Sequence, residues 1–309
     1  MTETLLDPNA AIARAPRQPH AISAEFSAYG EPLAHVAYLH DGTLEGLLCC
    51  IFEAYANREF PEDIVAEGRY QPRLDQSCRI VETDFTRAVR VRNGIEREAG
   101  PSAFYAVVRA AASDAYDAGA VVYRFVRYIM DPTTGRNKRA NVMNDLANPA
   151  IANIARLERR TANEEEKMRQ FVRFRHLSND VWFARCNPNC NVIPLVMTHF
   201  VARFNIQPFI IYDEVHHIAG VYDGSDWQIV RSEVAAIPED APNEALIQQA
   251  WQRFYDALSI NDRYNPELRR SFMPVRLWKN LTEMQTRVPE NAAHKLPKAG
   301  QTPGCLLQP

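Results

Sequence analysis

Acidic and thiol side chains are regularly spaced in the segment His40–Tyr55, whose sequence is HDGTLEGLLCCIFEAY. Asp41 lies in an expected turn, one residue after the histidine. Glu45, Cys49 and Glu53 follow at intervals of four residues, which places them in a row along one edge of a helix. Carboxylates in such a row can bind a metal ion or transfer a proton, although a solvated helix edge is the commoner meaning. Asp41 and Glu45, close together at the helix start, are the candidates for chemistry.

A second polar group lies within an apolar segment further along the chain. His199 and Arg203 are one helical turn apart in THFVARF, so each needs a polar partner if it is buried. Asp213, directly after an expected buried strand, is such a partner. We favour a structural network, because buried ion pairs often have only structural roles. The alternative is a functional histidine–arginine–aspartate site. If the chain is an enzyme, the expected catalytic residues are Asp41, Glu45, His199 and Asp213.

Basic and aromatic side chains gather near the end of the chain, in LRRSFMPVRLWKNL, and on an expected strand. Such a combination suits contact with phosphates and stacking on bases. Equally, the aromatic residues could anchor the last helical piece while the charges face water. The candidate nucleic-acid-binding residues are Arg173, Arg175, Arg269, Arg270, Arg276, Trp278 and Lys279. A second basic cluster comprises Arg136, Lys138 and Arg139.

The cysteines do not form a metal motif. Cys186 and Cys190 are four residues apart, but Ile193 stands where an iron–sulfur motif of this kind needs a third thiolate. A structural zinc site needs four ligands, and no second pair has suitable spacing. Glycine-rich phosphate loops, the nucleophile elbow and the zinc-deaminase motif are also absent from the sequence. We therefore expect no metal and no cofactor in this chain.

The elements that must position these residues change character near residue 167. Residues 35–167 are expected to be mainly helical, with one strand at His35–Leu39, a turn at Asp41-Gly42 and a helix capped by Thr43. Further helices are expected at Ser102–Tyr116 and Val121–Met130, separated by Gly119, and after Asn148-Pro149.

Residues 168–284 have the alternation typical of strands. Phe171–Arg175 and Val181–Arg185 read as a hairpin, and the apolar helix Val192–Asn205 and three more strands follow. The order β-β-α-β-β-β predicts an antiparallel sheet curled around one central helix, with C-terminal helices at Asn243–Ile260 and Pro266–Leu281. The fold class is therefore α+β.

Composition limits the remaining possibilities. The chain has 309 residues, a net charge of −3 and 46% hydrophobic residues, so no global positive field indicates nucleic acid. Residues 1–34 and 285–309 are rich in proline and are expected to be disordered. No apolar run approaches the roughly 20 residues that cross a bilayer, and unpaired cysteines favour a reducing compartment. We expect a cytoplasmic protein with no membrane partner.

Four long motifs appear in one order: DGTLEGLLCCIFEAY, ETDFTRAVRV, the stretch from MRQFVRFR to QPFIIYD, and SFMPVRLWKNL. Over about residues 35–284 the chain resembles a bacterial family of unknown function whose members are described as DNA metabolism or DNA repair proteins. The positions that match the family's motifs are Asp41, Gly42, Glu45, Gly46, Glu53, Arg173, His199, Phe200, Arg203, Asp213, Trp278 and Lys279.

The resemblance implies a partner that carries the chemistry. Members of the family resemble companions of a radical-SAM protein proposed to modify or repair DNA, so an iron–sulfur cluster and SAM are expected only in that partner. In other members a uracil-DNA glycosylase-like domain follows the WKNL motif. This sequence has the motif and is expected to lack that domain. The leading hypothesis is thus a DNA repair or modification factor that binds DNA or positions the partner. The alternatives are a hydrolase or transferase with an Asp/Glu/His cleft, and a protein-interaction scaffold.

Overall fold

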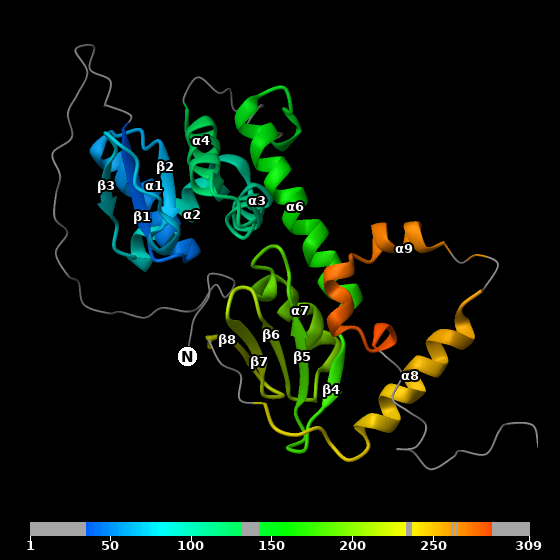
Figure 1. Cartoon of the computed structure of the whole chain (residues 1–309). Helices are drawn as coiled ribbons and strands as arrows, with labels where there is room; N and C mark the ends of the chain where they lie inside the picture. Colours follow the sequence, from blue (N-terminus) through cyan, green and yellow to red (C-terminus); the bar gives the residue numbers. More distant parts are fainter. Residues whose placement is uncertain (1–34, 132–141, 233–236, 261–262, 264, 286–309) are drawn as a thin grey trace, which may run out of the picture.

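The computed structural model of the chain describes residues 35–131, 142–232, 237–260, 263 and 265–285 (Figure 1). It confirms the α+β class, with a three-stranded sheet, a five-stranded sheet and helices that cover and connect them. The tails expected to be disordered lie outside the described residues except for Gln285, and so does the basic cluster within residues 132–141.

The first sheet is wholly parallel and has the strand order β2-β1-β3. Its strands are β1 (Val36–His40), β2 (Asp63–Ala66) and β3 (Ser77–Ile80). All five residues of β1 are buried, as is usual for a central parallel strand covered on both faces. The expectation of a mainly helical region with one strand was therefore incomplete. The two added strands have only four residues each and lack a long apolar run.

Helices surround this sheet, and the first of them has the cap expected from the sequence. The helices are α1 (Leu44–Asn57), α2 (Phe85–Ala99), α3 (Pro101–Ala111) and α4 (Ala118–Met130), with a 3₁₀ turn, η1, at Glu67–Arg69. Thr43 Oγ1 accepts a hydrogen bond from the backbone N–H of Gly46 at 3.0 Å, which confirms the predicted cap. Asp84 caps α2 in the same way.

Gly119 does not separate two helices, as we expected, but lies inside α4. A β-carbon at this position would lie 2.1 Å from the carbonyl oxygen of Ile64 in β2. The glycine is therefore required for the close approach of α4 to β2. The break between α3 and α4 comes earlier, at residues 112–117.

Helix α6 (Pro149–Phe171) connects the two sheets (Figure 1). Its 23 residues correspond to about 34 Å at 1.5 Å per residue. Asn148 caps it by accepting from the N–H of Ala150, and a short 3₁₀ turn, η2 (Val142–Asn144), precedes it. Arg109 of α3 pairs with the buried Glu165 of α6 at 3.0 Å. The boundary expected between residues 167 and 168 thus falls inside one continuous helix.

The second sheet has the order β4-β5-β6-β7-β8 and is mixed, which corrects the expected antiparallel sheet. The strands are β4 (Phe174–His176), β5 (Trp182–Cys186), β6 (Phe209–Asp213), β7 (Ile218–Tyr222) and β8 (Trp227–Arg231). Strands β5 and β6 are parallel because helix α7 (Ile193–Phe204) carries the chain back between them. The predicted hairpin is confirmed as the antiparallel pair β4 and β5.

Helix α7 packs on one face of this sheet, and the sheet stays open. A β-carbon on Gly220 of β7 would lie 2.3 Å from the sulfur of Met197, so the helix approaches closely there. The C-terminal elements are α8 (Glu244–Leu258), α9 (Pro266–Phe272), η4 (Val275–Asn280) and η5 (Thr282–Met284). No helix in the described part of the chain has the length and hydropathy to cross a membrane.

Candidate functional site

The Asp41 carboxylate organises the turn after β1. Its Oδ1 accepts hydrogen bonds from the N–H of Thr43 at 2.9 Å and from Thr43 Oγ1 at 2.5 Å. Its Oδ2 accepts from Thr83 Oγ1 at 3.0 Å, which joins the segments that follow β1 and β3. A β-carbon on Gly46 would lie 2.5 Å from Asp41 Oδ1. Both carboxylate oxygens of Asp41 therefore accept hydrogen bonds that hold the turn at the start of α1.

The row of Glu45, Cys49 and Glu53 faces α2 rather than solvent. Glu45 is buried, and Glu53 forms an ion pair with Arg87 of α2. The Cys49 thiol is hydrogen-bonded to the backbone of Asp84 at 3.2 Å. Burial raises the pKa of this thiol, so it stays protonated at neutral pH. The row accounts for packing between α1 and α2.

The contacts of His199 and Asp213 differ. The His199 ring packs edge-on against Phe200, with centroids 5.2 Å apart. Asp213 is fully buried and accepts hydrogen bonds from the N–H groups of Val215 and His216 at 2.8 and 3.2 Å. The partner predicted for His199 is therefore engaged elsewhere, by a histidine that the sequence patterns did not single out.

That histidine, His216, lies between two carboxylates. Its Nδ1 is 2.5 Å from Oδ2 of Asp213, and its Nε2 pairs with Oδ2 of Asp114. Arg69 Nη2 donates to the carbonyl of Asp114 at 2.7 Å. The cluster thus ties η1 and the α3–α4 connection, which belong to the unit around the first sheet, to the β6–β7 turn, which belongs to the unit around the second sheet. No pattern pointed to it, because Asp114 and His216 are 102 residues apart.

The charge state of His216 follows from these neighbours. Burial alone would lower its pKa, but the hydrogen bonds and negative charges of Asp114 and Asp213 raise it to about 9. The imidazole is therefore protonated at neutral pH and has no lone pair with which to accept a proton. This state suits an electrostatic link between the two units better than general-base catalysis.

Most of the cations predicted to contact nucleic acid are held in ion pairs. We call Arg173, Arg175, Arg276 and Lys279 the anchored set. Their partners are Glu283 at 2.8 Å, Asp240 at 3.0 Å, Glu164, and Glu214 at 2.6 Å, respectively. The side chain of Glu283 is only 1% exposed and that of Glu164 only 4%. Three of these pairs, those of Glu283, Arg276 and Lys279, join η5 and η4 to the body of the protein.

The remaining predicted residues lie near α9. Trp278 Nε1 donates to the carbonyl of Met273 at 3.0 Å, and the Arg269 guanidinium lies 5.1 Å from the Trp278 ring centroid. Arg270 is exposed. Trp278 thus contacts residues of α9 and its end, whereas Phe272, the other aromatic residue considered as an anchor to the sheet, is 71% exposed and Arg270 faces solvent.

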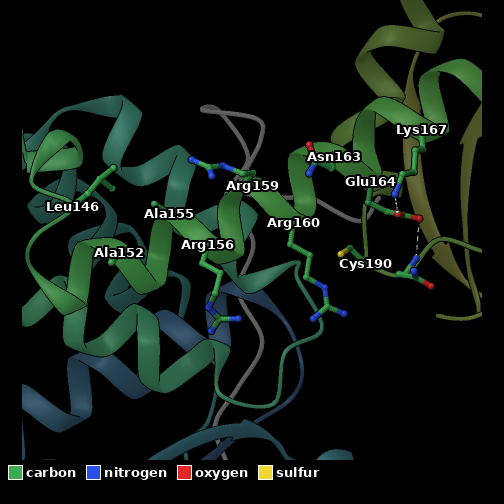
Figure 2. A pocket seen from close by; sticks show the side chains of 11 residues that line it. Leu146, Ala152, Ala155, Arg156, Arg159, Arg160, Asn163, Glu164, Lys167 and Cys190 are labelled. Carbon is green, nitrogen blue, oxygen red and sulfur yellow. Dashed lines mark hydrogen bonds and ion pairs between the residues drawn. The ribbon is translucent and has the colours of Figure 1, made fainter. Parts of the chain in front are cut away.

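An open groove of about 590 Å³ lies along α6 and reaches the β5–α7 loop (Figure 2). It is lined by basic side chains of α6 at helical spacing, which we call the α6 stripe: Arg156, Arg159, Arg160 and Lys167. Figure 2 shows Arg156 and Arg160 extending from the same side of the helix. Asn163 lies between them and Lys167 in sequence and is exposed.

The charges of this groove are only partly neutralised. Among the described residues, Arg159 and Arg160 have no carboxylate partner and both are exposed. Arg156 pairs with Asp117 at 3.4 Å, but both side chains are more than half exposed, and such pairs contribute little. Lys167 lies 3.5 Å from Glu164.

Glu164 forms a buried anchor beneath the groove. Its Oε1 accepts from the N–H of Asn189 at 3.0 Å and from Arg276 (Figure 2 shows the contact with the loop). One carboxylate therefore faces two cations, Arg276 and Lys167. The α6 stripe together with Arg276, Asp117 and Glu164 comprises five cations and two carboxylates, a formal excess of three positive charges.

The cysteine beside the groove has the surroundings of an unreactive thiol. Cys190 is buried, its thiol lies 3.5 Å from the carbonyl oxygen of Ser113, and burial raises its pKa. Cys186 is buried as well, with its pKa raised well above the usual value for the same reason. Within the described ranges, no group of three or more His, Cys, Asp or Glu side chains could hold a metal ion.

The groove is suited to a row of anionic groups. From Arg156 to Lys167 the helix rises about 16 Å, a length over which its cations can face more than one phosphate of a nucleic-acid backbone. The sequence contains the signal as RLERR followed by Lys167. It was missed because the neighbouring glutamates made the whole segment look like a solvated charged helix.

Comparison with protein families finds a match that includes the groove. A family model described as a domain of unknown function, DUF4130, matches residues 117–283, more than half of the chain. The chain belongs to the DUF4130 family. The DUF4130 match contains the α6 groove and the second sheet, and it leaves out the first sheet with Asp41 and Glu45. No curated protein matches the sequence significantly.

Proposed function

We propose that the chain is a nucleic-acid-binding component of a DNA repair or DNA modification system, and that the α6 stripe contacts the phosphate backbone. The observation that carries the proposal is the pair Arg159 and Arg160. Both are exposed beside a groove, and neither has a carboxylate partner among the described residues. Unpaired guanidinium groups are well suited to phosphate oxygens, which they can bind bidentately.

The resemblance to proteins described as DNA metabolism or repair factors supports DNA as the polymer. It also supports the second part of the proposal, that the chemistry belongs to a radical-SAM partner that carries an iron–sulfur cluster and SAM. In this arrangement the chain binds the DNA backbone and presents the strand to the partner. It contributes position and affinity, and no reaction is assigned to its own side chains.

The first test is binding of the full chain to fluorescently labelled single-stranded and duplex DNA, measured by anisotropy at several salt concentrations. Log affinity should fall linearly with log salt, with a slope of about −3 to −4 for duplex DNA if four cations contact phosphates. Arg159→Glu/Arg160→Glu should weaken binding by about 100-fold. It should also lower the magnitude of the slope by about 2.

A control with the same change in net charge is Arg203→Glu/Arg270→Glu, at two exposed arginines outside the groove. Because Arg270 belongs to the surface that we predicted from the sequence, this control also compares the two surfaces. Affinity should change by less than about threefold. An equal loss in both double variants would show nonspecific attraction, and undetectable binding by the wild-type chain would refute the proposal.

The partner is tested separately, by titration calorimetry of the full chain against the purified, cluster-loaded radical-SAM protein, with and without DNA. A complex with a defined stoichiometry is expected. Its absence under both conditions would remove the partner from the proposal and leave the phosphate contacts standing on the anisotropy data.

A further inference from the structure

Helix α8 is attached to the protein by only one of its faces. The buried Glu244 accepts a hydrogen bond from the N–H of His176 at 2.9 Å. Further along, Trp251 Nε1 donates to Glu283 at 2.9 Å, and Gln252 donates to the carbonyl of Thr282 at 2.8 Å. These contacts with β4 and η5 fix the helix at the edge of the molecule, where Figure 1 shows it in yellow.

The opposite face of α8 is apolar and exposed to solvent. Ile247, Phe254 and Leu258 are 41%, 53% and 64% exposed. Ala250 and Ala257 are exposed between them. The spacing of Ile247, Ala250, Phe254 and Ala257 is three, four and three residues, which is the spacing of a coiled-coil seam. A seam of this kind on the surface of a protein indicates an interface.

The order of side-chain sizes along the seam indicates what covers it. Large and small residues alternate as Ile247, Ala250, Phe254 and Ala257. If a second copy of α8 packs antiparallel about a two-fold axis, Ile247 lies against Ala257 of the second copy, and Ala250 lies against Phe254 of the second copy. Every large side chain then meets a small one. The seam is complementary to itself, as an isologous interface requires.

Nothing in the seam opposes such a contact. None of its four residues carries a charge, and the two alanines allow the helix axes to come close together. The helix has 15 residues, or about 22 Å. An interface of that length belongs at the small end of specific protein contacts, so the complex should dissociate on dilution.

We propose that two copies of this chain associate through the outer faces of their α8 helices, packed antiparallel with Phe254 of each copy against Ala250 of the other. The two-fold axis crosses the seam midway between Ala250 and Phe254. This association is independent of DNA binding, because the α6 stripe lies on a different helix.

The experiment is sedimentation velocity of the full chain over a range of concentrations, with four variants. Phe254→Ala leaves small side chains facing each other and should weaken the dimer by about 30-fold or more. Ala250→Phe brings two phenylalanines together and should weaken it similarly. The exchange Ala250→Phe/Phe254→Ala restores a large residue against a small one on both sides of the axis, and it should return the association to within about fivefold of wild type.

The fourth variant, Phe272→Ala, removes an exposed phenylalanine of α9 that is 71% exposed, and it should leave the dimer unchanged. Circular dichroism melts of all variants check that each one folds. A wild-type chain that stays monomeric would overturn the proposal. So would a dimer that neither single variant weakens, or one that Phe272→Ala weakens equally. Failure of the exchange variant to recover would overturn it too, because that outcome means that another segment or another protein covers the seam.

Discussion

The anchored set and the pair Arg159 and Arg160 of the α6 stripe are made of the same residue types but have different surroundings. Arg276 of the anchored set points to a buried carboxylate, Glu164, which is 112 residues away in sequence. Arg159 and Arg160 of the α6 stripe have no carboxylate partner among the described residues. A basic cluster in a sequence therefore does not reveal whether its charge is available. Availability depends on acidic residues that only the fold brings close.

The largest effect on stability is expected when the carboxylate of an anchored pair is removed. Glu164→Ala should lower the free energy of unfolding by about 3 kcal/mol or more, because it leaves the half-buried Arg276 without its carboxylate partner and the N–H of Asn189 without its acceptor. Chemical denaturation at pH 7 measures the change. The matched control is Glu166→Ala, two residues further along α6 and exposed, which should change stability by less than about 0.5 kcal/mol. Similar losses in both variants would show that burial does not distinguish these acids.

The cluster around His216 gives a second, pH-dependent test of the same idea. Its pKa is raised from 6.5 to about 9 in the folded protein, so the protonated form contributes stability. This contribution is complete below about pH 6.5 and is lost as the pH rises through about 9. His216→Gln should therefore cost about 2–3 kcal/mol at pH 6, and the cost should shrink towards pH 9.5.

Urea denaturation of the wild type and of His216→Gln across this pH range measures the difference. The control is His217→Gln, at the exposed neighbouring position, where no such trend is expected. A cost for His216→Gln that is independent of pH would mean that the ring contributes packing alone and that its charge does not link the two units.

Some parts of the fold could be predicted from the sequence and others could not. Local signals were reliable: the Thr43 cap, the helix that begins at Asn148-Pro149, the hairpin of β4 and β5, and helix α7 all depend on neighbouring residues. The parallel strands β2 and β3 were missed because four-residue segments gain their burial from the helices and strands around them. The parallel pairing of β5 and β6 was missed because the direction of a strand depends on its connection.

The candidate site was harder to predict than the fold. Asp41 and Asp213 were predicted as candidate catalytic residues, and the partners that the structure gives them, Thr83 and His216, could not be assigned from spacing. The α6 stripe was visible as a run of basic residues. What distinguishes Arg159 and Arg160 from the anchored set is that neither has an acidic partner among the described residues, and a linear pattern carries no such information.

The smallest expected effect completes the comparison. Arg159→Ala/Arg160→Ala should change the free energy of unfolding by less than about 0.5 kcal/mol, since neither side chain holds a partner among the described residues. The same substitutions should weaken DNA binding at low salt by about tenfold or more. Arg276→Ala should do the reverse, with a stability loss of about 2 kcal/mol and little change in the salt dependence of DNA binding. Denaturation and anisotropy on the same two proteins measure both quantities. If both variants lower stability and weaken binding to a similar extent, the division between anchoring and available cations is wrong. A cation that is available for DNA should be removable without loss of stability, because it has no role in the fold.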